Sequence, residues 1–279
     1  MMEIRPFTAG DIPFALEQTT REGWATGRSM FETYFEHDPD GAFVAWHEGG
    51  RLGMVTTTRY AASAWIGNLI VPPAFRSRGI GRKLMERGLC HLRDAGARTV
   101  RLDGDPPGLA LYRSLGFVDE YESLRFRRDP EHAGFAARSE RLEPGDLDGV
   151  LAFDAEHFGD DRGRLLRILF RRSRHAFVAR RDGNVVGYVL TEETNLGLRA
   201  GPCVATDAEV ASELLESVLA SAGPHAVMLG IPAPNQHGRK LLDALGFSPT
   251  PPSLCMVLGE PQAAGDLESI FAIAGGAIG

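Results

Sequence analysis

The 279-residue chain has few cysteines and no long apolar run. Its three cysteines, Cys90, Cys203 and Cys255, lie far apart, and none belongs to a C-x-x-C pair. This pattern argues against a disulfide framework and a zinc site, and it favours a cytoplasmic protein with reduced thiols. No stretch approaches the ~20 apolar residues that span a bilayer, and the first residues lack the apolar segment of a signal peptide. We therefore expect no membrane partner.

The chain also lacks an excess of basic residues. Thirty Lys and Arg stand against 37 Asp and Glu, for a net charge of −7. A nucleic-acid-binding face would need positive charge, so we expect no nucleic-acid partner. The acidic balance suits a cationic small substrate, although it is also ordinary for a soluble protein. No histidine has metal-ligand spacing, so we expect no metal. No Ser/His/Asp or cysteine nucleophile is evident either.

What the sequence does contain is an internal repeat. Three short segments recur in the same order at offsets of 135, 134 and 130 residues: Gly10-Asp11-Ile12 with Gly145-Asp146-Leu147, Ala42–Ala45 with Ala176–Ala179, and Leu115–Phe117 with Leu245–Phe247. A glycine follows each of the two Ala-Phe-Val-Ala segments at the same distance, as Gly53 and Gly187. This pattern indicates duplication of a whole domain. We predict domains over residues 1–128 and 139–260, a polar seam near 127–138, and a tail over 261–279.

The apolar pattern of the first half predicts a mixed α/β fold. We expect Asp11 to cap a first helix, followed by a second helix and a hairpin. A strand over residues 65–71 then ends at Pro72, a helix covers 79–95 with one apolar face, and a strand covers 99–103. The order strand, helix, strand implies a parallel pair with a right-handed crossover. Such sheets bind ligands where the strand ends and the helix begins.

The loop at this position has the composition of a phosphate site. It contains Arg76, Ser77, Arg78, Gly79, Ile80, Gly81 and Arg82. The first turn of a helix has free N–H groups and a positive dipole end, and glycines let a polyanion approach the backbone. The loop lacks the patterns of a P-loop and of a dinucleotide fingerprint. A glycine-rich turn with solvated arginines is the alternative interpretation.

The pattern R-x-x-G-x-G from Arg76 to Gly81, after a strand that ends in Val-Pro, resembles the acyl-CoA signature of the GNAT superfamily of N-acyltransferases. The segment Leu109–Phe117 resembles the later L-Y-x-x-x-G-F element of that superfamily. The resemblance implies two tandem GNAT-like domains, each a mixed, mostly antiparallel sheet with a central parallel strand pair flanked by helices. It also implies acetyl-CoA as the acyl donor and a primary amine as the acceptor.

The resemblance assigns roles to particular residues. The strand end at Leu69, Ile70 and Val71 would hold the pantetheine arm of CoA and polarise the acyl carbonyl. The loop from residue 76 to 82 would cradle the pyrophosphate. Tyr112 aligns with the tyrosine that protonates the departing thiolate, which a phenol can do. The alternative is that Tyr112 only packs between the helix and CoA.

The base that deprotonates the amine is not assigned by the sequence. Asp103 and Asp105 follow the second parallel strand and are candidate residues for the acceptor site. Alternatively, they cap the next helix or hold the loop. Glu22, at the end of the first helix, is a weaker candidate, and a proton relay through water is a further route.

The second half repeats the layout without the loop. Its counterpart, from Gly201 to Val210, has no arginine and no G-x-G, and it places Asp207 and Glu209 at a helix start, where they would repel a pyrophosphate. Leu242 stands near the position of Tyr112. This arrangement resembles tandem-GNAT proteins with one active and one degenerate domain. A motif of that subgroup runs from Asp154 to Arg162, and its Asp161 either meets a substrate cation or caps the next helix.

We therefore expect an acetyl-CoA-dependent N-acetyltransferase whose acceptor is a small-molecule amine rather than a protein, in a monomer or homodimer. A non-catalytic module that senses acyl-CoA or a metabolite is the alternative. The identity of the amine and the preferred acyl length stay open.

Overall fold

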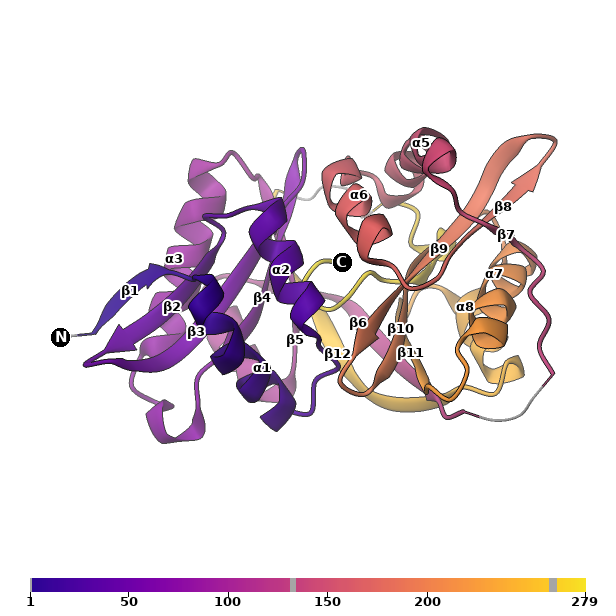
Figure 1. The fold of residues 1–279 in the computed structure, drawn as a ribbon. Helices are drawn as coiled ribbons and strands as arrows, with labels where there is room; N and C mark the ends of the chain where they lie inside the picture. The colour runs from indigo at the N-terminus through magenta and orange to yellow at the C-terminus, as the bar shows by residue number, and fades with distance from the viewer. Residues whose placement is uncertain (1, 131–133, 261–264) are drawn as a thin grey trace. The chain divides into compact units, whose positions relative to one another are not determined.

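The computed structural model describes residues 2–130, 134–260 and 265–279, which form two compact units (Figure 1). Within the described chain, unit 1 contains residues 2–118, 256–260 and 277–279, and unit 2 contains residues 119–255 and 265–276. The predicted domains and the compact units share most of their residues, and their ranges differ at the last strand of each half. Unit 1 includes residues 256–260, from the end of the predicted second domain, and unit 2 includes residues 119–128, from the end of the predicted first domain.

Unit 1 is built on a mixed sheet in the order β1-β2-β3-β4-β5-β12. Its strands are β1 (Glu3–Pro6), β2 (Ala42–His47), β3 (Gly50–Arg59), β4 (Ser63–Ile70), β5 (Thr99–Gly104) and the end of β12 (Ser248–Gly259). β4 and β5 pair in parallel, while β1 with β2, β2 with β3 and β3 with β4 are antiparallel. The predicted antiparallel sheet with a central parallel pair is confirmed.

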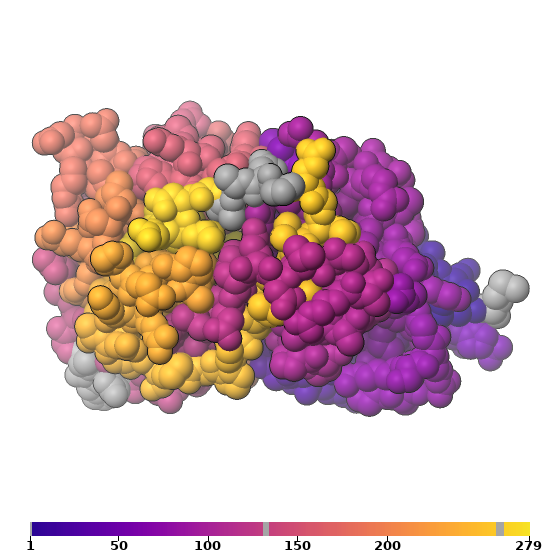
Figure 2. Space-filling view, turned by 180° about the vertical axis from the view of Figure 1, so that it is seen from behind, coloured from indigo at the N-terminus to yellow at the C-terminus, as the bar shows by residue number. Residues whose placement is uncertain are grey.

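Helices cover both faces of this sheet. They are α1 (Ile12–Arg21), α2 (Arg28–His37), α3 (Ile80–Asp94) and α4 (Leu109–Ser114). α1 and α2 lie in front of β2–β4 in Figure 1 and α3 lies behind them. The apolar face predicted for α3 is confirmed, because Leu84, Met85 and Leu92 are almost fully buried. The purple and magenta part of the chain, which includes α3 and α4, forms the surface of unit 1 in Figure 2.

Unit 2 repeats the plan on strands in the order β6-β11-β10-β9-β8-β7, with β13 added beside β10. These strands are β6 (Val118–Arg128), β7 (Glu140–Arg141), β8 (Ala176–Arg181), β9 (Asn184–Thr194), β10 (Gly197–Ala205), β11 (Val227–Pro232) and β13 (Ile270–Ala272). β10 and β11 are the parallel pair, and β6 pairs antiparallel with β11. The helices are α5 (Leu147–Phe158), α6 (Gly163–Arg172), α7 (Ala208–Ser221) and α8 (Gln236–Ala244). Among the described residues, none of the helices combines the length and apolar character needed to cross a bilayer.

The same close packing explains why positions 53 and 187 are both glycine. A methyl group added at Gly53 would lie 2.7 Å from the Ile70 carbonyl oxygen and 3.1 Å from Leu84 of α3. A methyl group added at Gly187 would lie 3.0 Å from the Val204 carbonyl oxygen and 3.0 Å from Leu214 of α7. In both units a strand therefore passes too close to its neighbour and to the crossover helix for any side chain.

The prediction that Asp11 caps the first helix is wrong, and both repeated aspartates bond an N–H group that precedes them in the chain. The Asp11 carboxylate does not bond the N–H groups of α1 but reaches back to the Thr8 N–H, at 2.8 Å. Arg5 and Arg51 also donate to this buried carboxylate, at 2.8 and 2.6 Å. Burial opposes its ionisation, but the hydrogen bonds from Arg5, Thr8 and Arg51 outweigh burial and hold the pKa of Asp11 well below its usual range. Asp146 bonds the Glu143 N–H in the same way, at 2.8 Å.

Candidate active site

The central parallel strands of unit 1 separate partway along their length. β4 and β5 pair from Ser63 with Thr99 to Trp65 with Arg101, and the pairing ends there. β4 continues to Ile70 and β5 to Gly104. The β5-facing backbone groups of residues 66–70 are therefore not used by the β4–β5 ladder. An extended ligand with amide groups can bond to such an edge as a strand would.

A bulge in β4 accompanies this separation. β3 pairs through Thr56 with Gly67 and through Met54 with Ile70, so that Val55 opposes two residues, Asn68 and Leu69. Asn68 has φ +49°, and its side-chain amide donates to Thr56 Oγ1 at 2.9 Å inside the protein. Asparagine tolerates this left-handed conformation better than most residues. A bulge turns a strand away from its original direction, so Asn68 helps to hold the edge of β4 open.

The glycine-rich loop enters α3 with an open first turn. Ser77 and Gly79 have φ +62° and +78°, and no side chain caps the helix that begins at Ile80. The first helical bond runs from Lys83 N–H to the Gly79 carbonyl, at 3.1 Å. A methyl group added at Gly79 meets nothing within 4 Å. Space is therefore open beside Gly79, at the positive end of the α3 dipole, where the first N–H groups of a helix suit an anion.

The basic side chains of the loop divide into two kinds. Arg76 holds the loop itself, because its Nε donates to the Val71 carbonyl at 2.8 Å and its guanidinium pairs with Glu22. Arg78 lies over the Phe75 ring at 5.8 Å and Arg82 donates to Ser114 at 2.6 Å. Both of these arginines are exposed and stand beside the open turn. Their charge reinforces the attraction of the turn for a polyanion.

Tyr112 lies at the carboxyl end of β5, on α4. Its side chain is buried, and a methyl group added at Gly108 would lie 2.9 Å from its hydroxyl oxygen. Gly104 and Gly108 leave the space that the ring occupies. Burial, with a smaller contribution from the Asp105 carboxylate, raises the pKa of Tyr112 to about 12. The phenol is therefore protonated at neutral pH.

The three candidate bases occupy different places. Asp103 is half-buried at the end of β5, and Asp105 is exposed at the start of the turn that leads to α4. The Gly108 N–H donates to the Asp105 carbonyl at 2.9 Å. Glu22 follows α1, and its carboxylate pairs with Arg76. The structure thus brings Asp103 and Asp105 to the same strand end as Tyr112 and leaves the choice of base open.

Comparison with known proteins places both halves in one family. Residues 13–117 match the family described as "Acetyltransferase (GNAT) family", and residues 150–272 match "Acetyltransferase (GNAT) domain". Together these two matches cover most of the chain.

The chain belongs to the GNAT superfamily of acetyltransferases.

Among its relatives is the Bacillus subtilis (strain 168) protein "Uncharacterized N-acetyltransferase YitH", 29% identical over 189 residues. That match covers 65% of each protein, so the chain spans slightly less than two thirds of this relative. A crystal structure of a putative acetyltransferase from Pyrococcus horikoshii has a TM-score of 0.85 at 27% identity, over 100% of this chain and 96% of that chain. A tandem GNAT protein from the clavulanic acid biosynthesis pathway shares the fold, with a TM-score of 0.63 at 17% identity over 94% and 99% of the two chains. The predicted tandem GNAT architecture is confirmed.

The second GNAT unit has a shorter loop at the equivalent place. Ile70 and Leu84 approach Gly53, and they lie 14 positions apart in the sequence. Val204 and Leu214 approach the equivalent Gly187, and they lie only ten positions apart. The N–H groups at the start of α7 are also occupied, because Asp207 accepts from Glu209 and Val210, both at 2.9 Å. The predicted cap by Asp207 is confirmed, and it places a carboxylate where unit 1 has an open turn.

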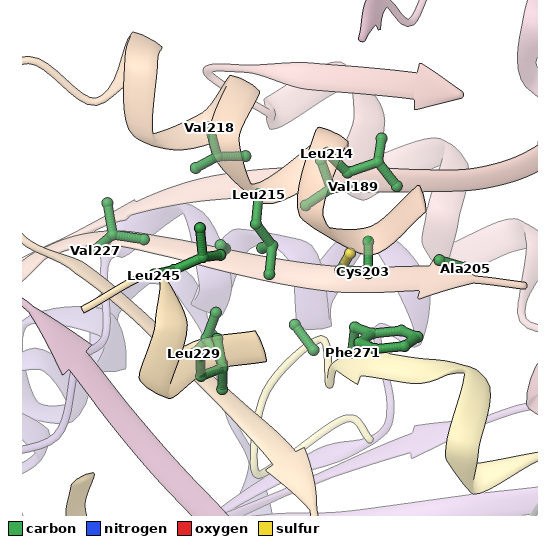
Figure 3. Close-up of a cluster of buried hydrophobic side chains, with 14 of the residues drawn as sticks. Val189, Cys203, Ala205, Leu214, Leu215, Val218, Val227, Leu229, Leu245 and Phe271 are labelled. Carbon is green, nitrogen blue, oxygen red and sulfur yellow. The ribbon is translucent and has the colours of Figure 1, made fainter. Parts of the chain in front are cut away.

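The second GNAT unit also fills the gap between its parallel strands. β10 and β11 pair only through Leu198 with Val227 and Arg199 with Met228. Beyond that point β13 pairs with β10, and the Ile273 N–H donates to the Gly230 carbonyl of β11 at 2.8 Å. Phe271 of β13 is buried in the apolar core, beside Cys203 and Ala205 (Figure 3). Residues 270–273 thus occupy the space between β10 and β11 where these two strands have separated.

Two further positions distinguish the second GNAT unit. Leu242 of α8, near the position of Tyr112, is buried and carries no proton donor. Asn235 caps α8 through its oxygen, at 2.6 Å from Gly238 N–H, and its amide donates to the Ile270 carbonyl at 3.0 Å. Asn235 therefore anchors β13 in the groove.

The motif from Asp154 to Arg162 forms a buried network. Arg162 bonds Asp154 through two nitrogens, each at 2.9 Å, and both side chains are 1% exposed. Tyr188 donates to the same carboxylate, and the Arg162 guanidinium lies 3.7 Å from the Phe158 ring centre. Asp161 accepts from the Gly163 N–H at 2.8 Å, as a helix cap does. This motif was recognisable in the sequence, but a role was predicted only for Asp161, and the buried Asp154–Arg162 pair was not predicted.

Proposed function

We propose that unit 1 is an N-acetyltransferase that transfers an acetyl group from acetyl-CoA to a primary amine by direct attack, and that unit 2 has lost CoA binding. The proposal rests on a difference between the two units at the start of the crossover helix and at the central parallel strands. Unit 1 has an open helix turn at Gly79 beside an open strand edge. Unit 2 has a capped turn at Asp207 and a groove filled by β13.

The residues of unit 1 suit the parts of the donor. The N–H groups from residue 77 to 82 would bind the pyrophosphate, with Arg78 and Arg82 adding positive charge. The edge of β4 at residues 66–70 would bond the amides of the pantetheine arm, as a neighbouring strand would. A backbone N–H in this edge would also polarise the acyl carbonyl and stabilise the oxyanion that forms on it.

The chemical step balances with the groups at hand. The neutral amine attacks the carbonyl carbon, so that a C–N bond forms while the C–S bond breaks. The departing thiolate takes the phenolic proton of Tyr112, and the phenolate regains a proton from water before the next turnover. The amine's proton passes to Asp103, to Asp105, to Glu22 or to water.

Two measurements test the proposal on the whole chain. Calorimetry with acetyl-CoA should show one site per chain, because only unit 1 has the open turn. Release of free CoA, followed with a thiol reagent, should occur with at least one amine from a panel of small primary amines, and more slowly with lysine peptides. Binding without release for every amine would identify a sensor instead, and two equivalent sites would contradict the assignment of unit 2.

A matched pair of glycine variants tests the location of the site. Gly79→Val should weaken acetyl-CoA binding at least tenfold, because a side chain would stand in the open turn and strain the backbone. Gly96→Val is the control. Gly96 follows the other end of α3, with φ +86° and nothing within 4 Å of an added methyl group, so the backbone strain is similar. Equal affinities in the two variants would exclude the Gly79 turn as the binding site.

A further inference from the structure

Residues 277–279 pack closely on β4 of unit 1. A methyl group added at Gly67 would lie 2.4 Å from the Ala277 side chain. A methyl group added at Gly279 would lie 2.5 Å from the Trp65 ring. The Tyr60 hydroxyl donates to the Ile278 carbonyl, and Ile278 is fully buried. This short segment is therefore held on the strand by shape and by a hydrogen bond.

This contact explains why position 67 is a glycine. Gly67 is not one of the glycines with positive φ, so the backbone conformation does not demand glycine there. A glycine inside a strand marks a place where another backbone comes close. Any larger residue at position 67 would push the segment away from the strand, directly before the bulge at Asn68.

The segment lies on the face of the sheet opposite α3. Side chains alternate along a strand, and Ile66 points toward α3, where a methyl group added at Gly88 would lie 2.7 Å from its Cδ1 atom. Trp65 and Gly67 therefore point to the face that α1 and α2 cover. Leu111 of α4 lies near Gly81 at the start of α3, so the proposed donor site belongs to the α3 and α4 face.

A donor that enters from the α3 face leaves one approach for the acceptor. The amine must reach the acyl carbon, beside residues 68–70, from the face that holds residues 277–279. We infer that residues 277–279, with Trp65 beneath them, form a wall of the amine site in unit 1 and limit the size of the acceptor. This inference rests on the proposed acetyltransferase function and adds the group that selects the substrate.

The wall discriminates by shape. It includes the side chains of Ala277 and Ile278 and the Trp65 ring, which are uncharged. The acceptor class that fits is a primary amine on a compact carbon skeleton, because a bulky skeleton would meet the segment.

The test uses the whole chain with residues 277–279 deleted, and amines of increasing size: ethylamine, benzylamine and tryptamine. In the deletion variant the kcat/KM ratio of tryptamine to ethylamine should rise at least tenfold, while the affinity for acetyl-CoA stays within twofold of the parent chain. Loss of a purely structural contact would lower both kcat/KM values together. An unchanged ratio in an active enzyme would overturn the wall and leave the proposed function intact.

Two further variants complete the design. Tyr60→Phe removes the hydroxyl that donates to the Ile278 carbonyl and should raise the same ratio at least threefold, which keeps the inference testable if the deletion variant does not fold. Gly10→Ala is the control, because its added methyl group meets only Thr8, at 3.6 Å.

Calorimetry of tryptamine on the CoA-loaded chain needs no turnover. Binding of tryptamine should tighten at least tenfold when residues 277–279 are deleted, and unchanged binding would also overturn the wall. Absence of turnover by the parent chain with every amine counts against the proposed function instead.

Discussion

At the scale of single residues, Asn68 combines two tasks that few side chains can perform together. It adopts a left-handed conformation within β4, and it fixes that conformation through its bond to Thr56. Its role was not predicted from the sequence, although a polar residue within an apolar strand, next to Leu69, is a visible signal. Its role depends on the register of β3 against β4, which a single sequence does not specify.

Variants of Asn68 separate the backbone from the hydrogen bond. Asn68→Val should strain the bulge by about 1–2 kcal/mol and weaken acetyl-CoA binding about tenfold, the equivalent of about 1.4 kcal/mol. Asn68→Gly keeps the backbone conformation and should bind acetyl-CoA within threefold of the parent chain. Calorimetry gives both affinities. Equal binding by all three proteins would show that the open edge of β4 does not depend on this bulge.

Tyr112 is the second residue whose role a variant decides. Tyr112→Phe should lower kcat about 100-fold, the lower range for loss of a general acid, with acetyl-CoA affinity within threefold. Because the folded-state pKa is raised to about 12, the phenol keeps its proton as pH rises through its ordinary value near 10. The kcat of the parent enzyme should therefore show no decline from this group below about pH 11. An unchanged kcat in the phenylalanine variant would mean that Tyr112 only packs against Gly108.

At the scale of helices and strands, local patterns predicted most of the first unit and the outline of the second. The amphipathic face of α3, the hairpin of β2 and β3, and the cap at Asp207 all depend on residues close in sequence. The loop from Arg76 to Arg82 was recognisable for the same reason. β13 was not predictable, because its partners β10 and β11 lie far away in the sequence.

The buried pair on α5 and before α6 should be the most sensitive polar contact of unit 2. Asp154→Ala leaves Arg162 charged and buried, and we expect a loss of about 3–5 kcal/mol in the free energy of unfolding. Asp161→Ala, in the same motif, removes only a helix cap and should cost about 1 kcal/mol. Urea unfolding of the whole chain compares them. Similar midpoints for the two variants would show that the Asp154–Arg162 pair adds little to stability.

At the scale of the whole molecule, the repeated halves exchange their last strands. β6 is the last strand of the predicted first domain, but it pairs with β11 of unit 2. The end of β12 belongs to unit 1, where Glu260 N–H donates to the Arg98 carbonyl at 3.2 Å and Thr99 Oγ1 donates to the Glu260 carbonyl at 2.6 Å. Neither predicted domain boundary therefore encloses a complete sheet, since strand partners distant in sequence have no local signal.

This exchange predicts how fragments behave. A fragment of residues 1–128 should lack cooperative unfolding, because β5 has lost its β12 neighbour. Residues 1–118 joined by a flexible linker to residues 248–260 should unfold more cooperatively and protect more amides from hydrogen exchange. Circular dichroism with exchange measurements decides between them. A well-folded 1–128 fragment would show that β6 can replace β12.

The same feature imposes an order on synthesis. A ribosome that has finished β5 must translate about 150 further residues before the native neighbour of that strand emerges, a delay of roughly 8–30 s at ordinary elongation rates. During this time the nascent chain carries a bare sheet edge of the kind that recruits other chains. Chaperone occupancy of ribosomes should therefore be greatest between codons 105 and 256.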